Sequence, residues 1–341
     1  MLITEEAIAR VDQARLHLIY DKWPEHFAEA AKISCKTHHD PDYYGNITLC
    51  GMGGSATSCD ILNELLHSFG NIPSNVKRGE CLSHQVNSSS LVIVNSASGN
   101  TREAVSMVEE ASIKGAEVIC ISAGGKLKEA ADKNGHRHIS IPNLAVPRAS
   151  LPYLLMPGLK LLEPFLRICV EDTCIPENLT RIRKQVSSAV PFEANTAKQI
   201  AGFLREGFAF CFASPFLSSV GTRFKNSLNE NAKVHCIHES ILESSHNEIV
   251  PFTFESDYPS RKILFLRWTR DLPIVGERFN KVNALLSRLR LPFIELCAFE
   301  TELINAIISS IYILDYSTIY MAVSRNVDPS ATPAIDILKS V

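Results

Sequence analysis

The stretch Leu91-Val92-Ile93-Val94-Asn95-Ser96-Ala97-Ser98-Gly99-Asn100-Thr101 determines the fold that this chain is expected to adopt. Its first half is a short apolar run rich in β-branched residues, which predicts a buried strand, and a helical pattern begins directly afterwards. In an open α/β sheet, ligands bind at the carboxyl ends of the strands. The N–H groups and the dipole at the start of the following helix favour an anion at that place.

Three hydroxyl side chains follow this strand, and each can donate a hydrogen bond to a phosphate oxygen: Ser96, Ser98 and Thr101. The loop has no lysine of the Walker type, so it suits a sugar monophosphate better than ATP. Ser and Thr are also common N-cap residues, which makes an ordinary helix cap an equal alternative. The segment alone leaves both interpretations open.

The composition is that of a folded globular protein, with 45% hydrophobic and 21% charged residues over 341 positions. This length accommodates two domains of ordinary size. The net charge of −3 offers no basic surface, so we expect no nucleic-acid partner. Several of the ten cysteines lie in apolar runs and no C-x-x-C pair occurs, which favours reduced thiols and a cytoplasmic location.

The most apolar long stretch, Leu303 to Val323, contains Asn305, Asp315 and Tyr316. These polar side chains predict a buried helix rather than a membrane span, so we expect no membrane partner. The N-terminus is acidic and lacks the basic region that begins a signal peptide.

Strand-like and helical segments alternate through the first half of the chain and predict a parallel sheet with helices on both faces. Apolar positions at helical spacing over residues 5–32 predict an N-terminal helix, which we include in a first domain at residues 1–175. The expected strands are 46–50, 91–95, 118–122 and 138–141, and the expected helices are 58–66, 102–113 and 126–132.

The same alternation restarts after a linker near residues 174–178 and predicts a second domain at residues 176–341. No sequence repeat is visible, so the duplication rests on the order of the elements alone. The expected fold is therefore α/β, with two doubly wound, flavodoxin-like parallel-sheet domains. The strands of the second domain are expected at 207–212, 234–237, 262–266 and 293–296, and its helices at 220–229, 279–288 and 303–323.

A glycine-rich turn over residues 51–56 follows the first expected strand and contains Gly54 and Ser55. Glycines permit positive φ angles and the close backbone approach that a bound ligand needs. The spacing is not G-x-G-x-x-G, and no acidic residue stands at a strand end about 20 positions on, which disfavours a dinucleotide site. Beside the Ser96 loop, this turn is expected to form one wall of a pocket.

Glu230 and His246 are the candidates in the second half for moving protons. A carboxylate can take a proton from carbon, and an imidazole can act as acid and base on oxygen. A solvated glutamate at the end of a helix and an incidental histidine in a polar loop are the more common alternatives. A metal site formed by His235, His238, Glu239 and His246 is disfavoured, because H-E-x-x-H is absent and because His235 and His238, three apart on a strand, face opposite sides. We therefore expect no metal.

Seven sequence blocks occur in an order that resembles the bifunctional phosphoglucose/phosphomannose isomerase family, which is built from two sugar-isomerase (SIS) domains. The resemblance implies a metal-free, cofactor-free isomerase that interconverts glucose 6-phosphate, and also mannose 6-phosphate, with fructose 6-phosphate through a cis-enediol. It also implies a homodimer with sites at the subunit boundary. The blocks are GMGGSA (51–56), SASGNT (96–101), SAGGKL (122–127), PRASLPYL (147–154), NENAK (229–233), SSHNEIVPF (244–252) and DPSATPAIDILK (328–339).

The resemblance assigns a phosphate cradle to the first domain. Gly54 provides the close backbone approach, and the hydroxyl groups come from Ser55, Ser96, Ser98 and Thr101.

The resemblance also assigns the reacting groups. Glu230 aligns with the base that moves a proton between C1 and C2 of the sugar. His246, acting from the partner subunit, and Lys339 align with the pair that opens the sugar ring. Arg148 aligns with the group that stabilises the enediol oxygens, and Thr332 with a threonine that leaves room for both C2 epimers.

The chain departs from the family pattern at Ala97, where an aromatic residue is usual, and at 226–228, where the run is usually bulkier and more polar. These differences concern substrate preference rather than reaction type.

Two other functions are open: a non-catalytic SIS protein that senses a sugar phosphate, and an amino-sugar phosphate isomerase or deglycase. A sensor would not need Glu230, His246 and Lys339 together, so their joint presence favours the isomerase.

Overall fold

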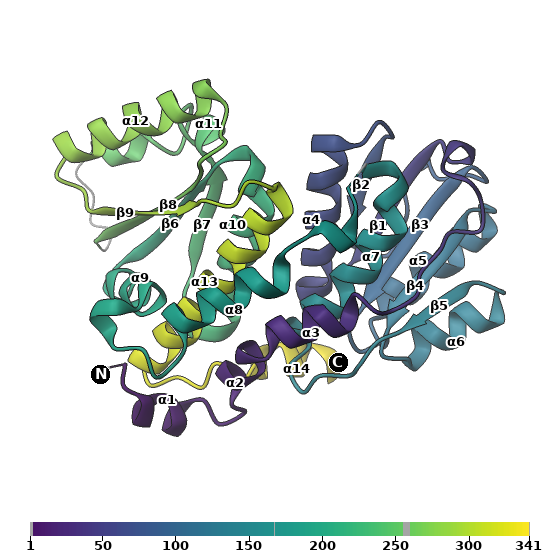
Figure 1. Cartoon of the computed structure of the whole chain (residues 1–341), viewed down its shortest axis with the longest axis horizontal. Helices are drawn as coiled ribbons and strands as arrows, with labels where there is room; N and C mark the ends of the chain where they lie inside the picture. The colour runs from purple at the N-terminus through teal and green to yellow at the C-terminus, as the bar shows by residue number, and fades with distance from the viewer. Residues whose placement is uncertain (1–2, 167, 255–259, 341) are drawn as a thin grey trace. The chain divides into compact units, whose positions relative to one another are not determined.

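The computed structural model describes residues 3–166, 168–254 and 260–340, and for residues 339 and 340 only the backbone. The chain forms two compact units, each built on one parallel sheet (Figure 1). We call Trp23–Pro176 unit A, and Met1–Lys22 together with Glu177–Val341 unit B. The α/β class with two doubly wound sheets is confirmed, whereas residues 1–22, which we expected in the first domain, belong to unit B.

The N-terminal segment forms three short helices instead of the one helix expected over residues 5–32. Arg15 adopts a left-handed conformation, with φ of 52°, and separates the first two helices. These two pack on the core helix of unit B, while the third packs in unit A. Apolar spacing continues through all three because each helix buries one face. They are α1 (Glu5–Val11), α2 (Leu16–Asp21) and α3 (Trp23–Ala30).

Unit A is a three-layer α/β structure with the parallel strand order β2-β1-β3-β4-β5. Helices α4 and α7 cover one face of this sheet, with α3 packed on α7, and α5 and α6 cover the other face (Figure 1). The order reverses between β1 and β3, and such a reversal is where doubly wound sheets bind ligands. The elements are β1 (Asn46–Gly51), α4 (Gly53–Phe69), β2 (Ser74–Lys77), β3 (Ser90–Ser96), α5 (Arg102–Ile113), β4 (Glu117–Ser122), α6 (Gly125–Lys133), β5 (Arg137–Ser140) and α7 (Leu151–Leu166), with 3-10 helices at Pro41–Tyr43, Pro147–Ser150 and Val170–Asp172.

The central strand of sheet A is β3, and all seven of its residues are buried. Val92 and Val94 face the layer of α5 and α6, where they join a core that includes Met107. A strand covered on both faces reads as a continuous apolar run, which is why the sequence predicted it. Sheet A also contains β2, which the sequence did not predict.

Unit B repeats this layout with the parallel strand order β7-β6-β8-β9. Helices α9, α10 and α13 lie on one face of its sheet, and α11 and α12 lie on the other (Figure 1). This order matches the first four strands of sheet A, so the predicted duplication of the architecture is confirmed. Its elements are α8 (Ile175–Val186), α9 (Thr196–Leu204), β6 (Phe208–Ala213), α10 (Ser218–Ser227), β7 (Cys236–Ser240), α11 (Ile241–Ser244), β8 (Arg261–Trp268), α12 (Pro273–Arg288), β9 (Phe293–Ala298), α13 (Leu303–Ser324) and α14 (Pro333–Ser340), with a π-helical turn at Leu228–Ala232 and 3-10 helices at Phe192–Ala194, Pro215–Leu217 and Val250–Thr253.

The core helix of unit B is α13. It is the one helix among the described residues that is long and apolar enough to cross a membrane, yet 94% of its most apolar window is buried inside the structure. Asp315 of this helix forms a buried ion pair with Arg223 of α10, with 2.6 Å between the carboxylate oxygen and Nη2. Burial lowers the pKa of Arg223, but the carboxylate of Asp315 and the hydroxyl of Tyr20 together more than offset this and leave the pKa raised. The expected buried helix is therefore confirmed.

Candidate functional site

Two loops meet at the β1/β3 reversal of sheet A. Gly51, at the end of β1, pairs with Asn95 of β3, so both strands end at the same level. Ser55 lies in the first turn of α4, and its Oγ accepts a hydrogen bond of 3.0 Å from the N–H of Ala97. The structure therefore brings together the two segments from which the sequence predicted a phosphate site.

The loop after β3 is a tight turn held by its own hydroxyl groups. Ser96 Oγ accepts from the N–H of Gly99 at 3.1 Å and lies 2.9 Å from Thr101 Oγ1. Gly99 has a φ of +71°, and a Cβ added there would lie 1.8 Å from the carbonyl oxygen of Gly124. This position requires glycine both for its backbone angle and for space. Ser98 is exposed at the tip of the turn, and its Oγ accepts from the N–H of Asn100 at 3.2 Å.

Neither helix that starts at this reversal has a side-chain cap. Thr101 is the N-cap residue of α5, but its side chain accepts no hydrogen bond from the helix, and Met52 at the start of α4 accepts none either. The interpretation of Ser96–Thr101 as an ordinary helix cap is therefore wrong. The first N–H groups of a helix attract anions when no side chain caps them. Two such helix starts and a set of hydroxyl groups lie at one edge of sheet A.

Arg148 joins this group from the 3-10 helix Pro147–Ser150. Only 8% of its surface is exposed. A Cβ added at Gly54 would lie 3.0 Å from the Cα of Arg148, so glycine allows the backbone of this helix to pack directly on α4. Unit A thus gathers every residue predicted for the cradle together with a buried guanidinium group.

Glu230 lies in unit B on a π-helical turn, Leu228–Ala232, that continues α10. The sequence predicted an ordinary helix ending at residue 229. The side chain of Glu230 is half-buried. Such π-helical turns are rare and occur frequently at functional sites, because they change the direction of side chains along a helix.

His246 follows α11, which packs on the face of sheet B opposite to α10. Its side chain is exposed, and its N–H donates to the carbonyl of Glu243 at 2.9 Å. Glu230 and His246 therefore approach from opposite faces of the sheet. Within unit B, the structure does not gather them as it gathers the cradle.

The remaining predicted residues belong to the C-terminal segment of unit B. Thr332 precedes α14, and its carbonyl accepts from the N–H of Ile335 at 3.0 Å in the first turn of that helix. The expected final helix is present. Lys339 lies in α14, but its side chain is outside the described part of the chain, so its predicted role stays a prediction.

The histidines near β7, His235 and His238, were the alternative candidates for a metal site. His235 precedes the strand, and the two ring nitrogens of His238 each lie 3.1 Å from a carbonyl oxygen, those of Cys211 and Ser218. Burial lowers the pKa of His238. Over the described ranges, no group of three His, Cys, Asp or Glu side chains is arranged to hold a metal ion.

Lys233, which was not predicted as a site residue, follows the π-helical turn with a φ of 55°. Its Nζ donates to the carbonyl oxygens of Glu230, Asn231 and Asp328. A lysine at a helix end where glycine is usual was the available signal. Asp328 is 95 residues further along the chain, and no local pattern predicts that contact.

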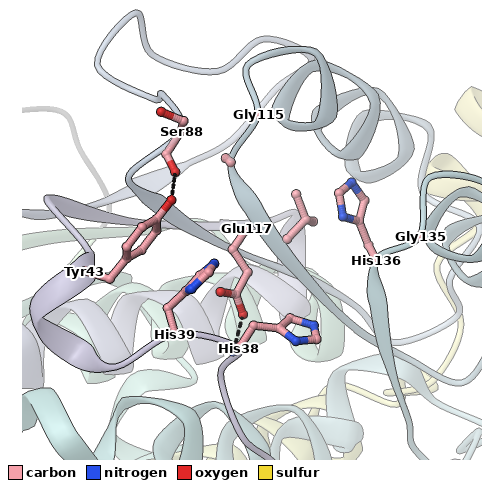
Figure 2. Close-up of a pocket in the computed structure, with 10 residues that line it drawn as sticks. His38, His39, Tyr43, Ser88, Gly115, Glu117, Gly135 and His136 are labelled. Atoms are coloured by element: carbon pink, nitrogen blue, oxygen red, sulfur yellow. Dashed lines mark hydrogen bonds between the residues drawn. The ribbon is translucent and has the colours of Figure 1, made fainter.

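A polar cavity of about 230 Å³ lies elsewhere in unit A (Figure 2). Its wall includes Glu117 and His136, at the start of β4 and β5, and His38 and His39 from the segment before β1. Glu117 accepts from the N–H of His38 at 2.8 Å, so the carboxylate fastens the segment before β1 to the sheet. This cavity is at the amino-terminal edge of sheet A, whereas ligands of such sheets bind at the carboxyl edge. The β1/β3 reversal is therefore the better candidate for the functional site.

Comparison with known proteins identifies the family of the chain. The SIS domain profile matches residues 44–143, and the profile of the bacterial phospho-glucose isomerase C-terminal SIS domain matches residues 193–341. A bifunctional phosphoglucose/phosphomannose isomerase from Caldicellulosiruptor bescii is 31% identical over 303 residues, which cover 86% of this chain and 88% of that protein. The chain belongs to the bifunctional phosphoglucose/phosphomannose isomerase family.

More distant relatives differ in activity or share only the fold. A D-glucosamine-6-phosphate 4-epimerase from Sulfolobus acidocaldarius is 28% identical over 246 residues, which cover 68% of this chain and 71% of that protein. The crystal structure of a hypothetical protein from Thermus thermophilus superimposes with a TM-score of 0.77 at 14% identity, covering 98% of this chain and 92% of that one. The second similarity shows the two-domain fold alone.

Proposed function

We propose that this chain is an aldose–ketose isomerase that interconverts glucose 6-phosphate, and mannose 6-phosphate, with fructose 6-phosphate. Family membership supports the reaction class, since relatives over most of the chain carry the name bifunctional phosphoglucose/phosphomannose isomerase. One structural observation carries the proposal: two helix starts without side-chain caps lie beside hydroxyl groups at the β1/β3 reversal. That arrangement suits the phosphate of a sugar phosphate.

The phosphate is assigned to Ser55, Ser96, Ser98 and Thr101, with the backbone at Gly54. Hydroxyl and N–H donors bind a phosphate by charge-assisted hydrogen bonds, which are stronger than hydrogen bonds between neutral groups. Binding at this distant end of the sugar holds the reacting carbons in one position and lowers the entropic cost of the reaction.

Glu230 is assigned as the base. It takes the proton from C2 of the open-chain aldose, the C2–H electrons form the C1=C2 double bond, and O1 gains a proton to give a cis-enediol. The 2-hydroxyl then loses its proton as C2=O forms, and Glu230 returns a proton to C1. Arg148 stabilises charge on the enediol oxygens.

The other assignments complete the reaction. His246, acting from the partner subunit of a homodimer, and Lys339 move the protons that open the sugar ring. Thr332 leaves room for either configuration at C2, which permits both aldoses. The reaction uses no metal and takes place in the cytoplasm. Turnover measured with and without a chelator tests the metal-free step, since loss of activity with chelator would contradict it.

The central experiment is Glu230→Gln, which keeps the shape of the side chain but removes the base. A positioned general base contributes roughly 10²- to 10⁴-fold to rate, so we expect kcat to fall by that factor for glucose 6-phosphate and mannose 6-phosphate. The phosphate donors are unaffected, so fructose 6-phosphate should bind as it does to the parent protein. Steady-state assays of both substrates and calorimetric titration measure the two effects.

The matched control is Glu277→Gln on the exposed surface of α12, whose carboxylate lies 4.0 Å from the ammonium of Lys281. This variant should keep full turnover, because surface ion pairs contribute little. If Glu230→Gln keeps its turnover, the assignment of the base is wrong.

A second candidate is an amino-sugar phosphate enzyme, which the epimerase from Sulfolobus acidocaldarius brings into consideration. The two functions differ in where the substrate exchanges hydrogen with water. An enediol isomerase exchanges hydrogen at C2 of glucose 6-phosphate and at C1 of fructose 6-phosphate, and NMR in deuterated water detects both. A protein that instead exchanges hydrogen only with glucosamine 6-phosphate would be the amino-sugar enzyme, and one that exchanges none would be a sensor.

A further inference from the structure

We infer that Lys233 is a positioning residue that holds the π-helical turn of Glu230 in its active geometry, an inference that rests on the proposed role of Glu230. The ammonium of Lys233 donates three hydrogen bonds to backbone carbonyl oxygens. They run to Glu230 at 2.8 Å, Asn231 at 3.2 Å and Asp328 at 2.6 Å. A lysine ammonium has three N–H donors, so it can form all three of these hydrogen bonds at once.

The first two of these bonds fix the end of the turn itself. The last carbonyl groups of a helix have no partner within the helix, and a π-helical turn is a rare way to end one. Lys233 binds the carbonyl of the very residue whose side chain is the proposed base. Without the ammonium, these carbonyl groups would accept hydrogen bonds from water instead, and the turn would be free to change its conformation.

The backbone at Lys233 shows that this position has a requirement beyond ending a helix. Its φ of 55° and ψ of 45° lie in the left-handed region, where glycine is the usual residue. A lysine there accepts backbone strain that a glycine would avoid. The side chain therefore supplies something that glycine cannot, and the three carbonyl contacts are what the structure shows it to supply.

The opposite flank of the turn is already fixed by α13. Asn231 Nδ2 donates to Thr318 Oγ1 at 2.7 Å, and Ser227 Oγ donates to Asp315 at 2.9 Å. Residues 227 and 231 are one turn apart and hold the same side of the segment. Glu230 therefore sits between an anchored flank and the ammonium of Lys233.

The third hydrogen bond joins the turn to the segment that leads to α14. Asp328, whose carbonyl binds Lys233, also accepts from the N–H and Oγ of Ser330 at 2.9 and 2.7 Å. This compact turn precedes Thr332 and the helix that contains Lys339. Lys233 thus ties two parts of unit B that both contain predicted site residues.

The decisive variant is Lys233→Gly, because glycine relieves the backbone strain while it removes the ammonium. A residue that merely ended the helix would be improved by glycine, and activity would not change. A positioning residue would lose rate, and a misplacement of about 1 Å in a catalytic group can cost about 100-fold. We expect kcat to fall by about 10- to 100-fold with KM nearly unchanged, since the cradle is in unit A.

The matched control is Arg290→Gly. Arg290 is also a basic residue in the left-handed conformation after a helix, with a φ of 57°. Glycine there should raise stability by the same backbone effect and leave kcat unchanged. Lys233→Arg keeps a cation with several donors and should recover part of the lost rate.

The double variant of Lys233→Gly with Glu230→Gln separates this inference from the proposed function. If Lys233 acts through Glu230, its substitution should have almost no further effect once the base is gone, because residues that act as a unit are not additive. If Lys233→Gly lowers kcat by the same factor in the parent protein and in Glu230→Gln, the inference is wrong. An unchanged kcat in Lys233→Gly alone would also contradict it. Retained turnover in Glu230→Gln alone would instead overturn the assignment of the base.

Discussion

Sheets A and B have the same strand order, with the reversal between β1 and β3 in one and between β6 and β8 in the other. At the first reversal, Ser96 and Thr101 lie beside helix starts that no side chain caps. At the second, Ser214 hydrogen-bonds to the carboxylate of Asp271, which also accepts from the N–H of Trp268 at 3.1 Å. The first edge offers donors to an incoming anion, whereas the second already contains an acidic group of its own.

The difference shows that a repeated topology does not repeat the site. Burial raises the pKa of Asp271, so its local surroundings favour the neutral form of the acid. A phosphate placed there would meet a carboxyl group in place of an exposed N–H. Unit B instead presents its candidate base, Glu230, on the turn that follows α10, just before β7 starts. In a parallel sheet, a helix between two strands runs back to the edge where strands begin. In the proposed function, the two units would therefore use opposite edges of their sheets.

Among the variants that test this comparison between the two sheets, Gly99→Ala is expected to have the largest effect. An alanine at this position would have a left-handed backbone conformation, and its Cβ would collide with the carbonyl oxygen of Gly124. We expect the free energy of unfolding to fall by about 3 kcal/mol, the sum of the backbone strain and the overpacking. Urea denaturation measures it, and phosphate-ligand binding should fall as the loop shifts.

Gly135→Ala is the matched control for this prediction. Gly135 has nearly the same φ, +70°, but no atom lies within 4 Å of an added Cβ. Only the backbone strain should appear, at about 1 kcal/mol. Equal losses at both positions would show that the Gly99 loop is not held by the contact with Gly124.

A smaller effect is expected from Thr101→Val, which removes a hydroxyl group but keeps the shape of the side chain. A hydrogen bond to a charged group contributes about 1.5–3 kcal/mol, so fructose 6-phosphate should bind about 10- to 100-fold more weakly. Ser214→Ala in sheet B should lower stability and leave this affinity unchanged. Calorimetric titration of both variants checks the comparison, and an equal loss of affinity in Ser214→Ala would contradict it.

The sequence predicted well those parts of the fold whose signals are local. Helix α5 was predicted at its observed bounds because its apolar face repeats cleanly between Thr101 and a polar turn. Strand β2 was missed because Ser74–Lys77 is short and polar and none of its residues is fully buried. The break at Arg15 was missed because apolar residues continue at helical spacing on both sides of it.

In the candidate site, too, the features with a local sequence signal were predicted and the others were not. The cradle was predictable because its glycines and hydroxyls are contiguous and end strands of obvious pattern. The turn that bears Glu230 was not, because no sequence pattern distinguishes a π-helical turn from the last turn of an α-helix. The hydrogen bond from Lys233 to the carbonyl of Asp328 is a tertiary contact between distant parts of the sequence, and no local sequence pattern predicts it.

The smallest effect is expected from Asp271→Asn, which removes the carboxylate from the sheet B reversal. An asparagine can still accept from Ser214, but its NH₂ group cannot accept from the N–H of Trp268, so the loss should be about 1 kcal/mol. The activity should not change, since this edge binds no substrate in our proposal.

The pH dependence makes this last substitution informative. Because burial raises the pKa of Asp271, the folded chain retains a proton at pH values where the unfolded chain has lost it. The contribution of Asp271 to stability is therefore complete at acidic pH and is lost as the pH rises through the raised pKa. The stability difference between the parent protein and Asp271→Asn should therefore shrink as the pH rises above about 4, the ordinary pKa of an aspartate. A difference that instead grows with pH would mean that the carboxylate is stabilised in its charged form, and the sheet B reversal could then no longer be described as an edge that disfavours negative charge.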